Sequence, residues 1–407
     1  MKLKLHWQIL LALIFGGVAG ILFPKATPYI SWLGDMFVNA LSMLIVPIMF
    51  FSIVTGISGI VSSGDDLRKL GLRTVGLYLL TMIIAIATGL ALVLLIQPGS
   101  GILLPEEVAK PSIEYRSIKD IIVGFVPKNI VDALSKNYTL PVILLAFVTG
   151  LNVPKLPQEE KKILNHFFKA GFELTMIVTK QVIVLAPIGI FAIVMKQFSG
   201  TSDFLLLIAD MLKYVLTVTI GLAIHTFVWL PLLLRFVCRV NSWQHFRNMS
   251  TPLLTAFSTA SSGAALPATL YAVEHKDGIS PKVTNFTIPL GSAINMDGAA
   301  LLECVAVIFI AQAYGIALTF PQTVLIAFTS LLCAIGAAGI PMAALVMMSL
   351  ILNVAGLPLE GIGLVIGVDR ILDMMRSAVN VYGDTCVAVM IAKTENEILP
   401  IDLPKNS

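Results

Sequence analysis

Charged residues are scarce in this chain. Aspartate, glutamate, lysine and arginine make up 13% of its 407 residues, whereas 57% are hydrophobic. A soluble domain has about 25% charged residues, so the composition excludes an ordinary soluble protein and predicts an all-α membrane protein. The net charge of +3 is too small to indicate a nucleic-acid partner.

Cysteine is rare as well, and the usual signatures of enzymes are missing. The four cysteines lie in or beside apolar stretches without the paired spacing of metal ligands: Cys238, Cys304, Cys333 and Cys386. We interpret them as small buried hydrophobic side chains. The sequence contains no glycine-rich phosphate loop, no Ser–His–Asp constellation and no histidine after His275. We therefore expect neither an enzyme nor an organic cofactor.

Long apolar runs are abundant. The first one begins like a signal peptide but has no evident cleavage site and is long enough to span, so we interpret it as a transmembrane helix. The runs of spanning length are 7–23, 36–60, 74–96, 140–153, 166–195 and 204–237. The stretch 97–139 is too polar to span and is expected to be a loop.

Basic residues predict the orientation. Lys2 and Lys4 precede the first run, and further lysines and arginines gather in alternate loops, at 68–73, 155–169 and 235–247. Because short cytoplasmic loops are rich in basic residues, we expect a multi-pass protein of the cell (inner or plasma) membrane with a cytoplasmic N-terminus.

Two later apolar segments are interrupted in the middle. Segments 250–273 and 321–354 contain small residues in the middle, and we expect Pro267 and Pro341 to break the helix in each, because proline removes a backbone donor and clashes with the preceding turn. Each segment precedes a helix with an Asn/Asp cluster. Paired, broken segments of this kind are typical of the binding region of transporters. We therefore predict an internal repeat with two re-entrant hairpins that meet near the bilayer centre. Alternatively, the prolines only kink ordinary spanning helices.

The segment from Gly367 to Lys393 carries a polar stripe. At helical spacing, the following residues share one face: Asp369, Asp373, Arg376, Ser377, Asn380 and Asp384. Such groups are expensive in lipid and usually face a cavity that binds a substrate or an ion. We predict that this stripe is one wall of a binding site.

Arg376 is the clearest functional residue of the stripe. A buried guanidinium needs an anion and binds carboxylates with two parallel hydrogen bonds. Asp373 can accept an ammonium group, so the pair suits a zwitterion with an additional carboxylate. The helix N-termini expected near Ser262 and Ala344 would present free N–H groups to the anionic end. Alternatively, Arg376 only pairs with Asp373 or Asp369.

Two Asn/Asp pairs suggest cation binding. Asn295 and Asp297 flank Met296 and precede Gly298, where a locally unwound turn would expose carbonyl groups. Asn380 and Asp384 form a second pair one turn apart. Oxygen ligands of this kind suit a small cation, whereas the alternative is hydrogen bonding between helices.

At these residues the chain strongly resembles the dicarboxylate/amino acid:cation symporter family. The resemblance runs from residues 41–57 to the end and is most specific in TASSGAALP, LGSAINMDGAALLECVAVIFIAQ, GAAGIP and LDMMRSAVNVYGD. It implies a homotrimer of subunits with eight transmembrane helices, two hairpins and inverted repeats, in which each core slides as an elevator. The second hairpin would be the extracellular gate.

The resemblance also implies a division of the chain. Residues 1–73 would be scaffold helices 1 and 2, and residues 74–139 would be helix 3 of the transport domain with an extracellular loop. Residues 140–200 would be scaffold helices 4 and 5. The transport core would be residues 201–407, with helix 6, hairpin 1, helix 7, hairpin 2 and helix 8.

Ligand roles follow from the same resemblance. Arg376 would hold the side-chain carboxylate of the substrate. Asp373 and Ser377 would hold the amino group, and Asn380 with the Ser262 amide would hold the α-carboxylate. Other residues of the substrate pocket would be Ser261, Ala299 and Ala344.

Three sodium sites are implied by the resemblance. The first would use Asn295, Asn380, Asp384 and the Gly291 carbonyl. The second would use the carbonyls of Ala293, Ala334, Ile335 and Ala337, with Met296 nearby. The third would use Tyr78, Thr81, Asn295 and Asp297.

Several residues depart from the pattern of the family. Ala299 stands where acidic-substrate members usually have threonine, and Ala344 replaces a glycine of the gate. The first hairpin has Ser261-Ser262-Gly263 instead of a serine triplet. Met82 replaces a hydroxyl residue, which weakens the expected third sodium site.

Arg376 nevertheless favours an acidic substrate, aspartate or glutamate. An unpaired buried guanidinium costs several kcal/mol, more than one lost hydroxyl hydrogen bond at about 1 kcal/mol. The alternatives are a neutral amino acid exchanger, a C4-dicarboxylate symporter and, from other classes, an ion channel or an intramembrane aspartyl protease.

Glu303 is expected to couple protons to transport. It lies two turns after Asn295, where proton-coupled members of the family have a glutamate. A buried carboxyl group can take up a proton on one side of the membrane and release it on the other. The alternative is a permanently protonated structural residue.

Overall fold

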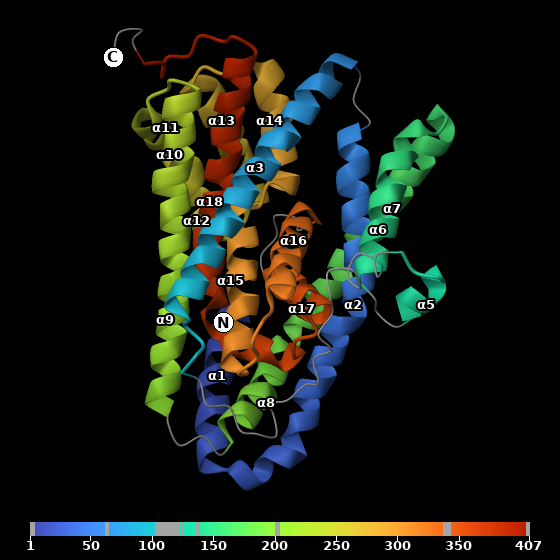
Figure 1. Cartoon of the computed structure of the whole chain (residues 1–407), viewed down its shortest axis with the longest axis vertical. Coiled ribbons are helices and arrows are strands. Elements are labelled where there is room, and N and C mark those ends of the chain that lie inside the picture. The colour runs from blue at the N-terminus through green and yellow to red at the C-terminus, as the bar shows by residue number, and fades with distance from the viewer. Residues whose placement is uncertain are drawn as a thin grey trace.

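The computed structural model describes residues 5–61, 65–101, 123, 126–135, 139–199, 204–336 and 343–403. This part of the chain consists almost entirely of helices and contains no strand beyond an isolated bridge between Val240 and Asp402. The helical fold agrees with the predicted all-α class. Most of the helices run along the long axis of the molecule (Figure 1).

The predicted apolar runs lie on the following helices: α1 (Leu5–Leu22), α2 (Thr27–Val61), α3 (Asp65–Ile96), α6 (Thr139–Asn152), α7 (Gln158–Val184), α8 (Ala186–Phe198) and α9 (Phe204–Ile224). The run 166–195 is therefore not one helix, because it is divided at Leu185. Pro187 lies in the first turn of α8, where its missing N–H costs least. A short helix, α5 (Ile130–Ser135), precedes α6.

A proline also shapes the end of the long α9 segment. Pro231 lies in α10 (Leu230–Leu232), between two π-helical turns, His225–Trp229 and Leu233–Val237. Proline removes a backbone donor and displaces the preceding turn, and widened turns of this type often occur at functional sites. His225 is the first residue of these widened turns.

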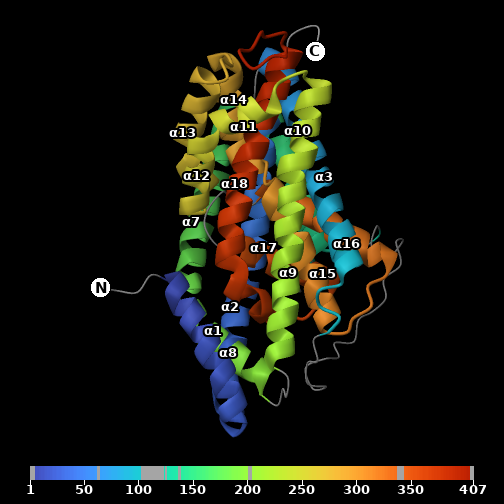
Figure 2. The same ribbon diagram turned by 90° about the vertical axis from the view of Figure 1, so that its left-hand side faces the viewer.

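Helices α1, α2, α6, α7 and α8 form one packed group. Helix α1 packs on α8, and α2 packs on α6, α7 and α8. Small residues permit the close approach, since a Cβ at Gly16 would lie 2.7 Å from the Phe191 carbonyl oxygen. Figure 2 shows α1, α2 and α8 side by side at one end of the molecule.

The second group surrounds α15 (Asp297–Ala313), which is buried along almost its whole length. Its neighbours are α3, α9, α16 (Phe320–Gly336), α17 (Ala343–Ala355) and α18 (Ile362–Thr394). The outer side of α18 is covered by α12 (Ser250–Thr259), α13 (Ser262–His275) and α14 (Pro281–Ile294). Helices α16 and α17 also contact α2 and therefore join the two groups.

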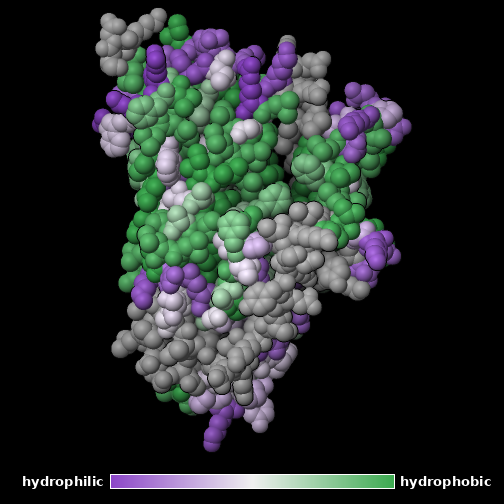
Figure 3. All heavy atoms as spheres, in the orientation of Figure 1, coloured by the Kyte–Doolittle hydropathy of each residue, from purple (hydrophilic) through white to green (hydrophobic). Residues whose placement is uncertain are grey.

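The surface supports a membrane location. Figure 3 shows hydrophobic residues over much of the visible side and hydrophilic residues gathered at the upper end. In the described part of the chain, three helical segments are long and apolar enough to cross a membrane: Lys69–Ile96, Met211–Val237 and Pro281–Ala313, the last of which comprises α14 and α15. Shorter apolar helices include Phe320–Ile335 and Ala344–Ala355.

The interruption in segment 250–273 is a tight turn, but Pro267 does not cause it. Helix α12 ends at Thr259, Ala260 adopts a left-handed conformation (φ 51°), and Ser261 caps α13 by accepting a hydrogen bond from the Ala264 N–H. Pro267 lies inside α13. The attribution of this break to proline was therefore wrong, because a left-handed residue and a serine cap make the turn.

The second interruption lies between α16 and α17. Helix α16 ends at Gly336 and α17 begins at Ala343, so Pro341 and Ala337 lie outside the described residues. The start of α17 agrees with the helix N-terminus expected near Ala344.

The two Asn/Asp clusters have different backbones. The first is unwound, because α14 ends at Ile294, Asn295 is extended (φ −97°, ψ 92°) and α15 begins at Asp297. The second lies inside α18, which is continuous from Ile362 to Thr394. The predicted unwound turn is therefore present at Asn295–Met296.

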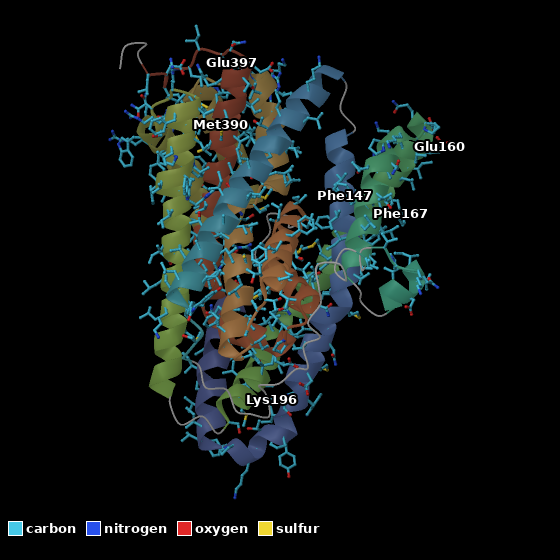
Figure 4. The ribbon with its side chains drawn as sticks, viewed as in Figure 1. Phe147, Glu160, Phe167, Lys196, Met390 and Glu397 are labelled. Atoms are coloured by element: carbon cyan, nitrogen blue, oxygen red, sulfur yellow. The ribbon has the colours of Figure 1, made fainter. Side chains whose placement is uncertain are left out.

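Residues 395–403 cross the end of the second group after α18. The Asn241 N–H donates to the Ile401 carbonyl at 2.8 Å, and the Leu403 N–H donates to the Arg239 carbonyl at 2.9 Å. Glu397, labelled at the upper end in Figure 4, accepts hydrogen bonds from the N–H and hydroxyl of Ser280. These contacts join α18 to the α11 (Ser242–Asn248) and α14 ends of the bundle.

Candidate functional site

Polar side chains from three helices meet around the break between α14 and α15. Tyr78 and Thr81 come from α3, Asn295 and Asp297 from the break, and Asp384 from α18. Each of these residues is at most 1% exposed. The structure thus brings together residues that the sequence assigned to the first and third sodium sites.

Around Thr81 there are more oxygen acceptors than hydroxyl hydrogens to bond to them. Thr81 Oγ1 lies 3.0 Å from Asp297 Oδ1, 3.4 Å from Asn295 Oδ1 and 3.0 Å from the Tyr78 carbonyl oxygen. A hydroxyl group has one hydrogen and can donate it to only one of these acceptors. Hard cations prefer such a gathering of hydroxyl, amide and carboxylate oxygens.

Asn295 connects the Asp384 carboxylate to Thr81, which in turn contacts Asp297. Its Nδ2 donates to Asp384 Oδ1 at 3.0 Å, while its Oδ1 faces Thr81. The Tyr78 hydroxyl donates to the Thr287 carbonyl at 2.8 Å, which fixes the tyrosine ring against α14. Asn295 therefore orients both its own amide oxygen and the Asp384 carboxylate.

His225 is a site residue that the sequence reasoning missed. Its Nε2 lies 3.1 Å from Asp297 Oδ2, both residues are fully buried, and its Nδ1 has no partner among the described residues. Asp297 is thus contacted by Thr81 on one oxygen and by His225 on the other. A single histidine in the apolar run 204–237 was the available signal.

Two glycines allow the helices to approach at this point. A Cβ at Gly291 would lie 2.5 Å from Asp384 Oδ1 and 2.6 Å from the Tyr78 hydroxyl oxygen. A Cβ at Gly383 would collide with Asp297 Oδ2. Any larger residue would displace the carboxylates.

Asn380 is bonded to the unwound turn. Its Oδ1 accepts from the Gly298 N–H at 2.7 Å, and its Nδ2 lies 3.1 Å from the Met296 sulfur. The interhelical hydrogen bonding left open by the sequence is therefore formed here. The roles of Asn380 toward a substrate and an ion stay predictions.

Arg376 and Asp373 form a buried ion pair on α18. The guanidinium Nε donates to Asp373 Oδ1 at 2.6 Å, and Nη2 lies 2.5 Å from the same oxygen. Arg370, which is one-third exposed, lies 3.5 Å from the other carboxylate oxygen. The internal pair that the sequence left open as an alternative is therefore present, and the substrate role of Arg376 stays a prediction.

Gly298, in the first turn after the break, lies directly against the backbone of Arg376. A Cβ at Gly298 would lie 2.7 Å from the Arg376 carbonyl oxygen and 2.9 Å from its Cα. Ser377 and Asp369 are each 4% exposed on the same helix. The polar stripe of α18 thus faces the centre of the second group of helices.

Glu303 lies in the middle of α15 and is fully buried. Neither of its carboxylate oxygens has a hydrogen-bond partner among the described residues. An ionised carboxylate without partners is very expensive in an apolar interior, so this environment favours the protonated form. A protonated Glu303 is compatible with both roles that the sequence leaves open, namely proton coupling and a permanently protonated structural residue.

The remaining predicted residues lie along the hairpin ends. Ser262 opens α13 and is 3% exposed, Ser261 is its cap, and Ala344 is buried in the first turn of α17. Ala299 is buried in the first turn of α15, and Met82 is 1% exposed beside Thr81. For the second sodium site, Ala334 is buried and Ala293 is exposed, while Ile335 is half-buried.

Buried acids exceed buried bases in this region. Among the described residues, the buried acids on α15 and α18 are Asp297, Glu303, Asp369, Asp373 and Asp384, and the bases that contact them are His225, Arg376 and the partly exposed Arg370. Even with a protonated Glu303, four carboxylates face three basic side chains. Buried charges need partners, so this region favours bound cations.

Comparison with known proteins identifies the family. Residues 5–394 match the sodium:dicarboxylate symporter family. The chain is 32% identical to the proton/sodium-glutamate symport protein of Geobacillus stearothermophilus, over 97% of this chain and 96% of the relative. It is likewise 32% identical to the proton/glutamate-aspartate symporter of Escherichia coli (strain K12), over 97% and 94%.

A human protein is similar as well. The human excitatory amino acid transporter 2 is 34% identical over 98% of this chain and 81% of the relative. These proteins are membrane transporters and not enzymes, and they confirm the resemblance drawn from the motifs. The chain therefore belongs to the sodium:dicarboxylate symporter family.

Proposed function

We propose that this protein is a symporter that carries an acidic amino acid, aspartate or glutamate, together with sodium ions. The observation that carries the proposal is the buried Arg376–Asp373 pair on α18, where the Arg376 backbone packs against Gly298 just after the break. Relatives at 32% identity are named as glutamate and glutamate-aspartate symporters.

The ion pair provides complementary charges for a zwitterion with an extra carboxylate. On binding, the substrate carboxylate replaces Asp373 as the partner of Arg376, and the substrate ammonium replaces Arg376 as the partner of Asp373. No buried charge is left alone in this exchange, which keeps its cost low. Ser377, Ala299, Ala344 and the amide of Ser262 complete the proposed pocket.

Sodium ions would bind at the oxygen cluster. The proposed first ion uses Asp384, Asn295, Asn380 and the Gly291 carbonyl. The proposed third ion uses Tyr78, Thr81, Asn295 and Asp297. Support comes from the contacts around Thr81 and from the excess of buried acids. A second ion would lie between the ends of α14 and α16.

Glu303 would carry a proton during transport. Its burial and its lack of hydrogen-bond partners favour the neutral form. Exposure to water during the transport cycle would allow it to ionise and release the proton.

The transport motion is proposed to be an elevator within a homotrimer. In the proposal, α3 and α9 to α18 form the moving core with its two re-entrant hairpins, and α1, α2, α6, α7 and α8 form the scaffold. The division of packing contacts between these two groups supports this assignment. The N-terminus would lie in the cytoplasm.

A C4-dicarboxylate is the second candidate substrate, and Arg370 favours it. Because Arg370 lies 3.5 Å from Asp373 Oδ2, it can neutralise Asp373 while Arg376 binds a substrate without an ammonium group. The name of the family also refers to dicarboxylates. A neutral amino acid, with its α-carboxylate bound at Asn380 and the Ser262 amide, has no side-chain carboxylate to replace Asp373 beside Arg376.

Uptake of labelled aspartate into proteoliposomes tests the proposal. Purified protein should accumulate aspartate only when an inward sodium gradient is present, with glutamate as a competitor. Succinate and malate should compete poorly. Sodium-independent conductance without saturable uptake would instead indicate an ion channel, and preferential uptake of serine or alanine would indicate a neutral exchanger.

A further inference from the structure

A second buried polar cluster lies on the face of α18 next to the sodium-site residue Asp384. It consists of His245 and Asn248 on α11, Asp277 in the loop between α13 and α14, and Thr385 on α18, and we call it the His245 cluster. His245, Asp277 and Thr385 are all fully buried. None of these residues has a part in the proposed substrate or ion sites.

The hydrogen bonds of the cluster form one continuous chain. Asn248 Nδ2 donates to Asp277 Oδ1 at 2.7 Å, and Asp277 Oδ2 lies 2.6 Å from His245 Nδ1. On the other side of the ring, His245 Nε2 lies 3.1 Å from Thr385 Oγ1. This series of hydrogen bonds connects the α13–α14 loop to α18 through the His245 imidazole.

The direction of each bond follows from Thr385. Its hydroxyl donates to the Tyr382 carbonyl at 2.8 Å, so it has no hydrogen left for His245. His245 Nε2 must therefore donate to Thr385 Oγ1. The remaining hydrogen bond, between His245 Nδ1 and Asp277 Oδ2, joins the ring to the α13–α14 loop.

This cluster holds α18 on a face beside the ion site. Asp384 and Thr385 are neighbours, so their side chains leave the helix about 100° apart. Asp384 is held by Asn295, and Thr385 is held by His245. His245 also stacks on Tyr382, one turn earlier, with ring centroids 5.5 Å apart.

We propose that the His245 cluster is a positioning device for sodium binding, which fixes the rotation of α18 so that Asp384 faces Asn295. This inference rests on the proposed sodium symport and assigns residues outside the ion ligands to it. The substrate pair is more distant from the cluster along α18, since Arg376 precedes Thr385 by nine residues. Loss of the cluster should therefore weaken sodium binding more than substrate binding.

Substitutions at Thr385 and His245 test the positioning role. Thr385→Val keeps the shape of the side chain but cannot accept from His245, and His245→Phe keeps a ring but removes both ring nitrogens and their two hydrogen bonds. One lost buried hydrogen bond corresponds to about a fivefold effect, so Thr385→Val should raise the sodium concentration for half-maximal uptake by about that factor, and His245→Phe by more. The KM for aspartate at saturating sodium should remain that of the wild type.

Substitutions at Asp277 test whether the cluster needs only the hydrogen bonds of this residue or also its charge. Asp277→Asn can accept from Asn248 and donate to His245 Nδ1, so it should retain the wild-type sodium dependence. Asp277→Ala breaks the chain and should behave like His245→Phe. His275→Phe, at the exposed end of α13, is the matched control and should change nothing.

Sodium-induced thermal stabilisation in detergent gives a readout that does not require transport. Wild-type protein should gain stability with increasing sodium, and Thr385→Val should need about fivefold more sodium for the same gain. Equal sodium dependence of Thr385→Val and wild type would overturn the inference, and so would an Asp277→Asn variant as impaired as Asp277→Ala. Absence of sodium-dependent uptake by the wild type, with these stabilisation shifts present, would instead overturn the proposed transport function.

Discussion

His225 Nε2 lies 3.1 Å from Asp297 Oδ2, on the side of the carboxylate opposite to Thr81. Asp297 is therefore held on both oxygens by residues from two different helices. This arrangement fixes the carboxylate in the orientation in which it, Asn295 and Thr81 converge. Residues that orient Asp297 without being acidic themselves should therefore influence the sodium dependence of uptake.

Thr81→Val should weaken sodium coupling. The substitution removes the hydroxyl that contacts both Asp297 and Asn295, and one such contact is worth about 1 kcal/mol, or about a fivefold change. The sodium dependence of aspartate uptake measures the effect. Thr74→Val is the matched control, because the Thr74 hydroxyl on the same helix only bonds to the Leu70 carbonyl. An equal effect of both variants would contradict a role of Thr81 in the ion site.

Arg376→Cys should abolish transport of aspartate and glutamate. It removes the guanidinium that would bind the side-chain carboxylate, and the lost charge-assisted bonds correspond to about a hundredfold fall in uptake at low substrate concentration. Small neutral amino acids should then compete better than aspartate. Arg370→Cys controls for the general loss of an arginine beside Asp373 and should retain aspartate uptake. Unchanged preference in Arg376→Cys would refute the assignment of the substrate class.

Glu303→Gln should remove the pH dependence of uptake while sodium dependence remains. Glutamine is similar in size to a protonated glutamate, but it cannot release a proton. Uptake measured between acidic and alkaline pH, with and without a pH gradient, checks the prediction. Glu274→Gln, on α13, serves as the control. If Glu303→Gln keeps the wild-type pH profile, Glu303 is a structural residue.

Gly383→Ala and Gly76→Ala should have opposite effects. A Cβ at Gly383 collides with the Asp297 carboxylate, whereas a Cβ at Gly76 on α3 meets no atom within 4 Å. In an exposed helix, replacing glycine with alanine stabilises by up to about 1 kcal/mol. Gly76→Ala should therefore raise the melting temperature in detergent, and Gly383→Ala should lower it and reduce the stabilisation by sodium. Equal melting temperatures would contradict the close packing of α18 against α15.

Much of the fold was predictable because lipid imposes a simple rule on sequence. Apolar runs in the range 7–237 correspond to helices, and the small residues before Ser262 mark the start of α13. The unwound turn at Asn295–Met296 was predictable because an Asn, an Asp and a Gly cluster in an otherwise apolar helix. The roles of prolines were less predictable, since Pro267 is accommodated inside α13 while the left-handed Ala260 makes the turn.

From residue spacing alone, the candidate site was predictable only where its residues share one helix or one motif. Tyr78 and Thr81, on α3, were assigned to it through the resemblance to the family. The stripe of α18 follows from spacing, because residues three or four apart share a face. His225 and the His245 cluster come from separate helices, and their partners depend on tertiary packing that no local pattern encodes. The direct bond between Arg376 and Asp373 also depended on side-chain geometry that spacing leaves open.

The break at Asn295–Met296 makes two helix ends meet at one point. Helix α14 ends there with the partial negative charge of its dipole, while α15 begins there with partial positive charge. A cation at the first end and a carboxylate at the second lie in the fields of both helix dipoles and of each other. Binding of one ligand should thus raise the affinity for the other, so that the broken helix itself would enforce the coupling of the two fluxes.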